Sequence, residues 1–556
     1  MTLGINLFLI FLLIYTLQSN NVEAISRVDP LVNTNLGLIQ GLHATDGDYS
    51  MFMGIPYARV DPSNPFGASI PQEPFDAVFE AVDDSAMCPQ IDEFNNTLTG
   101  SLDCLHLNVY VPTTAASKNK LSVLVWIYGG SFKRGLAGRL IYGPKYLVRH
   151  DVILVTVNYR VGPYGFMCLD IPEVPGNSGF KDQLLALRWI KNNIEAFGGD
   201  SSKITVFGES AGSMAVDYHL LYPHEKLFDQ AILQSGTALS KFAAPDTDAA
   251  QKIAAYLGFE TDSKNHALSF LATVDTNLVI AASSVLGFNF VPCIEQQFDS
   301  VEGFILQDWA EPALIPKINK MPIIIGYNSD ERLSAYVDEP ETFFDDLKTF
   351  EKTLGSSFDL SLPQFKDLEN IVRHFYIGDE DISIAKKIEI SNFESDIMYL
   401  HPTYRTISKY LANNVGNVYH YVFSYTGDRN YIKRQKNIMD GGAVHADELG
   451  YFFDVSFFDE TPTVQDQIVI DRITTMWTNF VKFGNPTPQI SELLPVQWKP
   501  ITKNSLQFAL DISSDLSLIT RPFHSRMAFW DIIYKLRENI INKKLNTLAL
   551  NRVFKY

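Results

Sequence analysis

Residues 204–212 read Ile-Thr-Val-Phe-Gly-Glu-Ser-Ala-Gly, an apolar run that leads into the pentapeptide Gly-x-Ser-x-Gly. The run predicts a buried strand, and the pentapeptide predicts a tight turn into a helix with Ser210 exposed at its tip. Side chains at Gly208 and Gly212 would collide with their neighbours in such a turn. Taken alone, the pentapeptide is equally compatible with an ordinary loop, so the flanking sequence must decide.

The sequence on both sides of the pentapeptide carries a series of motifs. In chain order they are Phe52-Met53-Gly54-Ile55-Pro56-Tyr57-Ala58, Asp103-Cys104-Leu105, Leu107-Asn108-Val109, Gly176-Asn177, Asp182-Gln183, Phe197-Gly198-Gly199-Asp200 and His445-Ala446-Asp447-Glu448-Leu449. Together they resemble the type-B carboxylesterase and cholinesterase family, and most of all the secreted esterases of insects. The resemblance covers nearly the whole chain after residue 25. It implies an α/β-hydrolase fold, with a large, mostly parallel, twisted central sheet and helices on both faces.

Length and composition favour one large domain after a leader. No linker, charge block or repeat divides the 556 residues, and 46% of them are hydrophobic, so we expect a single α/β catalytic domain over residues 25–556. Residues 1–24 contain an apolar stretch from Leu7 to Leu17 and end with Val22 and Ala24 at the positions typical of a signal-peptide cleavage site. The stretch is shorter than the roughly 20 residues that span a bilayer. We therefore expect a secreted, extracellular protein without a stable membrane anchor.

The net charge of the chain and the absence of certain motifs argue against several functions. The formal charge is −19, which repels phosphate backbones and argues against nucleic-acid binding. His224-Glu225 begins like a zinc-protease motif, but Phe228 stands where the second histidine belongs. No phosphate-binding glycine fingerprint is present. We therefore expect no metal and no cofactor, and the sequence does not indicate an oligomeric state.

Four cysteines and one sequon bear on processing. The resemblance implies that Cys88 and Cys104 form the family's first disulfide. Cys168 and Cys293 lie in apolar segments, which favours buried free thiols, and the family's usual partners for a second disulfide are missing from this chain. Asn95, in Asn95-Asn96-Thr97, is the chain's one permitted glycosylation acceptor.

Ester hydrolysis by a serine needs a base and a residue that orients the base. In this fold the order along the chain is Ser, acid, His. His445 follows the flexible stretch Gly441-Gly442 and matches the family's catalytic histidine. Glu331 follows a predicted buried strand, residues 322–326, and matches the family's acid. Asp330 is the nearest rival.

Two further acids and one cation complicate this assignment. Asp447 and Glu448 are weaker candidates for the acid because they lie too close to His445 in sequence. Arg332 stands where the family has glycine, and it is expected either to lower the pKa of Glu331 or to point to solvent.

Another predicted strand, residues 122–127, leads into Tyr128-Gly129-Gly130-Ser131-Phe132. By resemblance, the backbone N–H groups of Gly130, Ser131 and Ala211 form an oxyanion hole. Relatives usually have Gly or Ala where this chain has Ser131, so we expect strain there if the backbone needs a positive φ.

The substrate is less well defined. No tryptophan lies between residues 89 and 103, which disfavours choline esters. Leu286 and Phe288 match the family's acyl-pocket stretch, although core packing explains them equally well. Juvenile-hormone esterases usually carry Gln where Glu209 stands, which favours a more general esterase. We therefore expect a serine hydrolase for small-molecule, apolar carboxylic esters, with a non-catalytic ester-binding or adhesion protein of the same fold as the alternative.

Overall fold

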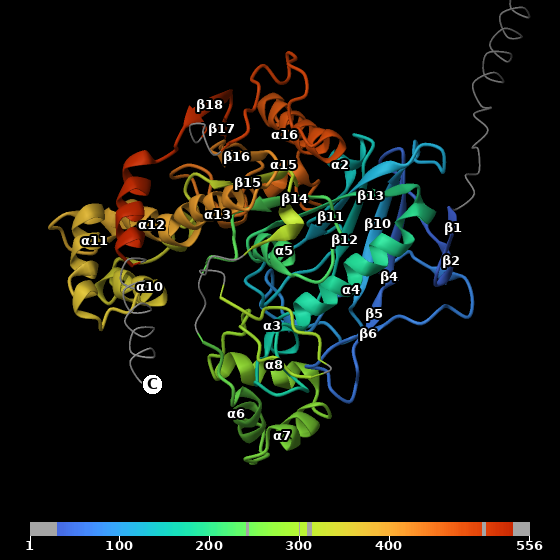
Figure 1. The fold of residues 1–556 in the computed structure, drawn as a ribbon, viewed down its shortest axis with the longest axis horizontal. Helices are drawn as coiled ribbons and strands as arrows, with labels where there is room; N and C mark the ends of the chain where they lie inside the picture. The colour runs from blue at the N-terminus through green and yellow to red at the C-terminus, as the bar shows by residue number, and fades with distance from the viewer. Residues whose placement is uncertain (1–29, 241–243, 300, 309–313, 503–507, 538–556) are drawn as a thin grey trace, which may run out of the picture.

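The computed structural model describes residues 30–240, 244–299, 301–308, 314–502 and 508–537, so the predicted signal peptide lies outside the described residues (Figure 1). Its centre is an eleven-stranded sheet. In spatial order the strands are β18 (Leu516–Thr520), β17 (Phe508–Ile512), β16 (Val418–Phe423), β15 (Ile323–Asn328), β14 (Gln230–Gln234), β13 (Gly199–Glu209), β11 (Leu121–Ile127), β12 (Ile153–Val157), β10 (His106–Pro112), β4 (Tyr49–Pro56) and β3 (Leu42–His43).

The middle of this sheet is parallel. The seven strands from β17 to β12 all run in one direction, whereas β18, β10, β4 and β3 pair antiparallel at the margins. Strands β11, β12, β15 and β16 are buried along their whole length. Such continuous burial is typical of parallel strands covered on both faces, and it explains their unbroken apolar sequences. The carboxyl ends of these strands therefore share one edge of the sheet.

Helices cover both faces of the sheet. In spatial order, β12 lies on one side of β11, whereas β13 and β14 lie on its other side, so the chain reverses its direction across the sheet after β12. Right-handed crossovers therefore place the connecting helices on opposite faces. The helices that contact the sheet are α2 (Lys145–Val148), α4 (Ser178–Asn193), α5 (Ala211–Leu221), α13 (His401–Ala412) and α16 (Val464–Phe483), and α15 (Leu449–Phe452) packs against α2 and α16. The predicted large, mostly parallel sheet with helices on both faces is confirmed.

Two helical groups extend from the sheet (Figure 1). One contains α3 (Gly162–Phe166), α6 (Ala249–Tyr256), α7 (Lys264–Leu271) and α8 (Thr276–Val285). The other contains α9 (Glu341–Asp345), α10 (Thr349–Ser357), α11 (Leu368–Ile377), α12 (Lys387–Ser395) and the π-helix η6 (Asp396–Leu400), which leads into α13. This second group, here called the α9–α12 lobe, packs around a hydrophobic cluster separate from the main core.

The remaining elements are short. Small sheets form from β1 (Leu31–Thr34), β2 (Gly37–Gln40) and β7 (Phe79–Glu80), from β5 (Ala58–Arg59) and β6 (Ile70–Pro71), and from β8 (Gln90–Ile91) and β9 (Leu98–Thr99). The short helices are η1 (Ile194–Phe197), η2 (Pro316–Ile318), η3 (Leu333–Ala335), η4 (Pro363–Phe365), η5 (Ile384–Lys386) and α14 (Tyr431–Lys436).

Both cysteine pairs are joined. Cys88 is bonded to Cys104, as the resemblance implies. The expectation that Cys168 and Cys293 are free thiols is wrong, because they form a second disulfide across 125 residues. Both are buried, as their apolar neighbours predict, but apolar neighbours carry no information about a partner so distant in sequence. Gly176 makes room for this bond, since a Cβ there would lie 2.5 Å from both sulfur atoms.

Denatured, unreduced protein should therefore contain no thiol that reacts with a maleimide. A non-reducing digest analysed by mass spectrometry should yield one peptide pair linked through Cys168 and Cys293 and another linked through Cys88 and Cys104. Cys168→Ser should expose one free thiol, at Cys293. Labelling of Cys168 or Cys293 in the unreduced wild type would contradict the second bond.

A fully buried ion pair ties the first third of the chain together. Arg160 and Asp182 are both inaccessible to solvent, and two guanidinium N–H groups donate to the carboxylate at 2.8 Å each. Arg160 also donates to the carbonyl of Pro65, and Ser69 donates to Asp182. The predicted motif residue Asp182 thus links β12, α4 and the segment before β6.

Arg160→Met should lower the free energy of unfolding by about 3–5 kcal/mol, because it leaves the Asp182 carboxylate buried without its cation. Urea unfolding followed by tryptophan fluorescence measures this loss. Lys252→Met, which breaks an exposed pair with Asp246, is the control and should cost under about 1 kcal/mol. Equal effects of the two substitutions would refute a special role for the buried pair.

Candidate active site

Ser210 occupies the turn between β13 and α5 in a strained conformation. Its backbone has φ 56° and ψ −125°, a region that residues with side chains rarely adopt. A Cβ at Gly208 would lie 2.5 Å from the backbone of Gly212, and one at Gly212 would lie 2.0 Å from the carbonyl of Ile127. The two glycines therefore permit the turn, and the turn holds the Ser210 side chain beyond the sheet edge, partly accessible to solvent.

The structure brings Ser210, His445 and Glu331 together in a continuous chain of hydrogen bonds. His445 Nε2 lies 2.8 Å from Ser210 Oγ, and its Nδ1 lies 2.6 Å from a carboxylate oxygen of Glu331. Glu331 is fully buried, and its other oxygen accepts the backbone N–H of Asn328 at 2.8 Å. This places a base between a hydroxyl and a fixed carboxylate.

The rival acids have other partners. Asp330 accepts from the hydroxyl of Ser329 and from the backbone N–H of Gly442. Asp447 accepts the backbone N–H groups of Val444 and Lys433. Both carboxylates thus shape the loop that carries His445.

Arg332 forms an ion pair with a neighbouring acid. Its guanidinium donates to Glu394 at 2.9 Å, and its side chain is 32% exposed, so it does not simply point to solvent.

Three backbone N–H groups face the same region. Ser131 has φ 57° and Gly130 has φ +111°, so the expected left-handed conformation is present at Ser131. A Cβ at Gly129 would lie 2.9 Å from the Cβ of Ser210, which shows how closely this loop approaches the serine. The N–H groups of Gly130, Ser131 and Ala211 have no backbone or side-chain acceptor in the described part of the chain. They are free to donate to a developing oxyanion.

Glu209 is a site residue whose position the sequence analysis did not use. Its carboxylate is buried and lies 3.2 Å from His445 Nε2. Burial raises the pKa of Glu209 to about 8, and burial likewise raises the pKa of nearby Glu448 to about 7. Burial alone would lower the pKa of His445, but the phenol oxygen of Tyr399 and the carboxylates of Glu209 and Glu331 outweigh it, so the net shift is upward. The position of Glu209 directly before Ser210 in the pentapeptide was the sequence signal that could have placed it in the site.

Asn328 and Tyr399 were also missed. Asn328 donates through its amide nitrogen to the carbonyl of Val444 and to Glu448, which joins the acid's loop to the histidine's loop. Tyr399 lies in the π-helix η6, and its ring centroid is 4.9 Å from that of His445. Single π-turns often occur at functional sites, but no sequence signal predicted this one.

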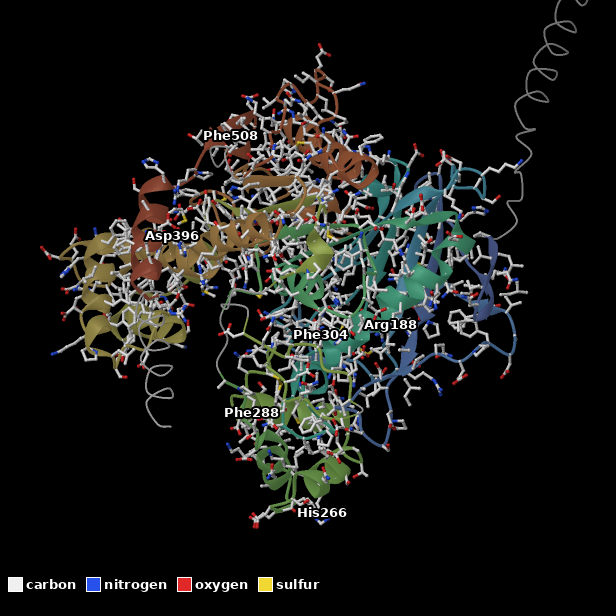
Figure 2. The ribbon with its side chains drawn as sticks, viewed as in Figure 1. Arg188, His266, Phe288, Phe304, Asp396 and Phe508 are labelled. Carbon is white, nitrogen blue, oxygen red and sulfur yellow. A yellow bond between two sulfur atoms is a disulfide. The ribbon has the colours of Figure 1, made fainter. Side chains whose placement is uncertain are left out.

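A cavity of about 970 Å³ opens onto Ser210, Ser131 and Ala211. Its apolar lining includes Phe132, Met214, Leu239, Val291, Ile397 and Met398. Leu286 and Phe288 are not among the lining residues, whereas their neighbours Asn289 and Val291 are. Leu286 is 39% exposed, and Phe288 packs beside Phe290 near α8 (Figure 2).

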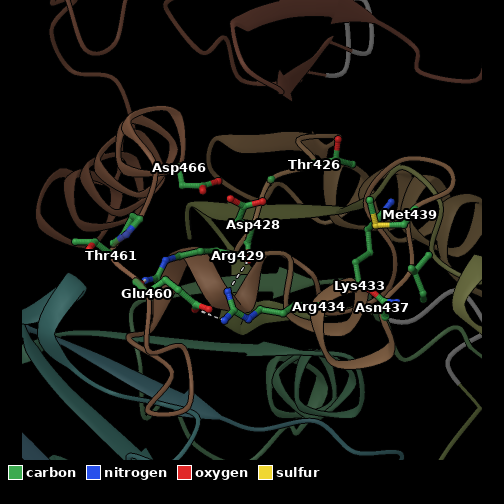
Figure 3. Close-up of a pocket in the computed structure, with 13 residues that line it drawn as sticks. Thr426, Asp428, Arg429, Lys433, Arg434, Asn437, Met439, Glu460, Thr461 and Asp466 are labelled. Atoms are coloured by element: carbon green, nitrogen blue, oxygen red, sulfur yellow. Dashed lines mark hydrogen bonds and ion pairs between the residues drawn. The ribbon is translucent and has the colours of Figure 1, made fainter.

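A second cavity, of about 490 Å³, is lined by residues from the segments 426–439 and 460–466 (Figure 3). Its lining includes Arg429, Lys433 and Arg434. The two arginines donate to Glu460, and the ammonium of Lys433 donates to the carbonyls of residues 440, 441 and 442. These cations therefore have partners within the protein, and Lys433 fixes the segment that precedes His445.

No group of three or more His, Cys, Asp or Glu side chains in the described part of the chain is arranged to hold a metal ion. None of the described helices has the length and apolar character needed to cross a membrane.

The chain is similar to known esterases over most of its length. The sequence model of the Carboxylesterase family matches residues 28–530. The chain is 33% identical to juvenile hormone esterase of Tribolium castaneum, over 87% of this chain and 88% of that protein, and 32% identical to esterase FE4 of Myzus persicae, over 82% and 83%. The crystal structure of juvenile hormone esterase from Manduca sexta with OTFP covalently attached superposes with a TM-score of 0.79 at 26% identity, covering 91% of this chain and all of that one. The chain therefore belongs to the carboxylesterase family, with the α/β-hydrolase fold, and is a carboxylesterase.

Proposed function

We propose that this carboxylesterase hydrolyses apolar carboxylic esters through a Ser210–His445–Glu331 triad and an acyl-enzyme intermediate. The observation that carries the proposal is the unbroken hydrogen-bonded sequence from the Ser210 hydroxyl through the His445 imidazole to the buried Glu331 carboxylate. The apolar lining beside Ser210 supports an apolar acyl or alcohol group. Val291 and Asn289, rather than Leu286 and Phe288, are proposed to contact it.

The proposed reaction has two halves. Ser210 Oγ attacks the ester carbonyl carbon while its proton passes to His445 Nε2, and the carbonyl oxygen becomes an oxyanion held by the N–H groups of Gly130, Ser131 and Ala211. The C–O bond to the alcohol then breaks, and His445 gives its proton to the departing oxygen. Water repeats the sequence on the acyl-enzyme and releases the carboxylic acid and free Ser210.

The proposal also covers the signal peptide, secretion and glycosylation of the chain. We propose that residues 1–24 are removed as a signal peptide, that residues 25–556 form a single secreted domain and that Asn95 carries a glycan. Asn95 is exposed in the loop between β8 and β9, and Thr97 of its sequon donates to it. Two disulfides are consistent with an oxidising compartment.

A binding protein of the same fold is not favoured. The family's adhesion branch generally lacks the serine, whereas here serine, histidine and acid are present and in contact.

Ser210→Ala should lower kcat for p-nitrophenyl butyrate by about 10⁴-fold or more, because the nucleophile is lost while the fold is not. Ser202→Ala, at the opposite end of β13, is the control and should retain wild-type turnover. Wild-type protein no faster than Ser210→Ala would favour a binding function.

An organophosphate fluoridate should add one phosphoryl group to the wild type, visible as one mass increment in the intact protein. Peptide mapping should place it on Ser210, because the proton acceptor and the oxyanion donors meet only there. Labelling of Ser210→Ala to the same extent would overturn the assignment of the nucleophile.

Glu209→Gln should shift the acid limb of the kcat/KM profile to lower pH. His445 acts as a base only when neutral, so the rate falls as pH drops through its apparent pKa, which the Glu209 carboxylate raises. An uncharged amide removes that effect. The control is Glu80→Gln on the surface, whose profile should match the wild type. An acid limb that stays in place or moves to higher pH in Glu209→Gln would contradict the coupling.

A further inference from the structure

The lining of the active-site cavity combines apolar and polar side chains. The α9–α12 lobe contributes the hydroxyl and charged groups of residues 346, 348, 349, 352, 353, 356 and 357, beside the apolar side chains of Phe343 and Leu347. The charged lining residues are Lys133, Arg332, Lys348 and Lys352, together with Asp346 and Glu394. Arg332 and Glu394 form an ion pair with each other. The remaining lining charges are three lysines and one aspartate.

None of the three lysines is part of an ion pair among the residues that the structure describes. Within the described part of the chain, no carboxylate lies within ion-pair distance of the ammonium groups of Lys133, Lys348 or Lys352, and none of these groups donates a hydrogen bond. All three side chains are exposed. Their charges therefore remain available to a molecule that enters the cavity.

In residues 338–359 the basic side chains line the cavity, whereas most of the acidic side chains do not. Between residues 338 and 359 the chain has seven acidic residues and two lysines. Both lysines line the cavity, whereas Asp346 is the only acidic residue of the seven that does. A segment this acidic, in a protein with a net charge of −19, thus presents mainly cations to the cavity. Such a local reversal of sign attracts anionic ligands into a cleft.

The positions of Lys348 and Lys352 do not stabilise helix α10. Lys348 is the N-cap of α10 and Lys352 lies in its first turn, four residues apart on one face. Like charges at that spacing repel, and cations are unfavourable at the end of a helix where the N–H groups are free. Stability of α10 therefore does not account for two lysines on this face.

We propose that Lys133, Lys348 and Lys352 form a cationic outer subsite that selects esters carrying an anionic group remote from the ester bond. The preferred substrates are then amphipathic: an apolar part beside Phe132, Met214 and Val291, and a carboxylate or similar anion toward α10. This inference rests on the proposed hydrolysis at Ser210 and adds the class of ester that enters the cavity.

Paired substrates test the subsite. On the acyl side, p-nitrophenyl decanoate is compared with mono-p-nitrophenyl sebacate, which has the same chain length and a terminal carboxylate. On the alcohol side, decyl acetate is compared with the acetate of 10-hydroxydecanoic acid in a pH-stat. The readout is the ratio of kcat/KM for the anionic ester to that for the neutral ester. Hydrolysis at Ser210 is tested with the neutral esters alone, by comparing the wild type with Ser210→Ala. A failure of the proposed hydrolysis can therefore be told apart from a failure of the proposed subsite.

In at least one pair the wild type should prefer the anionic ester, and the preference should shrink when NaCl is raised from about 0.02 M to about 0.5 M. Lys348→Met and Lys352→Met should each lower the ratio about 1.5- to 5-fold, the range of an exposed ion pair, and Lys348→Glu should lower it further. The matched control is Lys118→Met, which makes the same charge change before β11, at the opposite edge of the sheet. Ratios at or below one in both pairs, or equal losses in Lys118→Met and the cavity variants, would overturn the subsite.

Discussion

The turn between β13 and α5 is the constraint on which the rest of the active site depends. It is possible only because Gly208 and Gly212 lack side chains, and it forces Ser210 into a conformation with φ 56°. Strain of this kind persists only where the surrounding structure determines the backbone fully, and here β13 lies between β11 and β14 in a buried parallel sheet. The sheet therefore holds the hydroxyl at a fixed place, and the loops after β11, β15 and β16 bring the other groups to it.

A second feature is the density of carboxylates around one imidazole. Glu331 fixes His445 on one side, and Glu209 approaches its other nitrogen, while Glu448 is held by Asn328 and Gln234. Burial raises the pKa of Glu209 to about 8 and that of Glu448 to about 7, so the charge of each carboxylate depends on which neighbouring groups hold a proton. The protonation of this group is thus a property of several residues together rather than of His445 alone.

The sequence predicted those parts of the site that short motifs determine. Ser210, Glu331 and His445 each follow a recognisable strand or loop, and the structure places them in contact. The bond between Cys168 and Cys293 could not be predicted in the same way, because it depends on how α3 and the segment after α8 pack together. Phe288 is not among the residues that line the cavity although its neighbours Asn289 and Val291 are, and no sequence motif fixes which residues of such an irregular segment face a cavity. The roles of the π-turn at Tyr399 and of Lys348 and Lys352 could not be predicted either, because they depend on the neighbouring His445 and on the cavity.

The second hydrophobic cluster joins the α9–α12 lobe to the central sheet. Besides the lobe's own side chains it contains Tyr327 of β15, Val422 of β16 and Ala509 of β17. Tyr327 lies four residues before Glu331, so a substitution that loosens the lobe would reach the strand that carries the acid as well as the wall of the cavity.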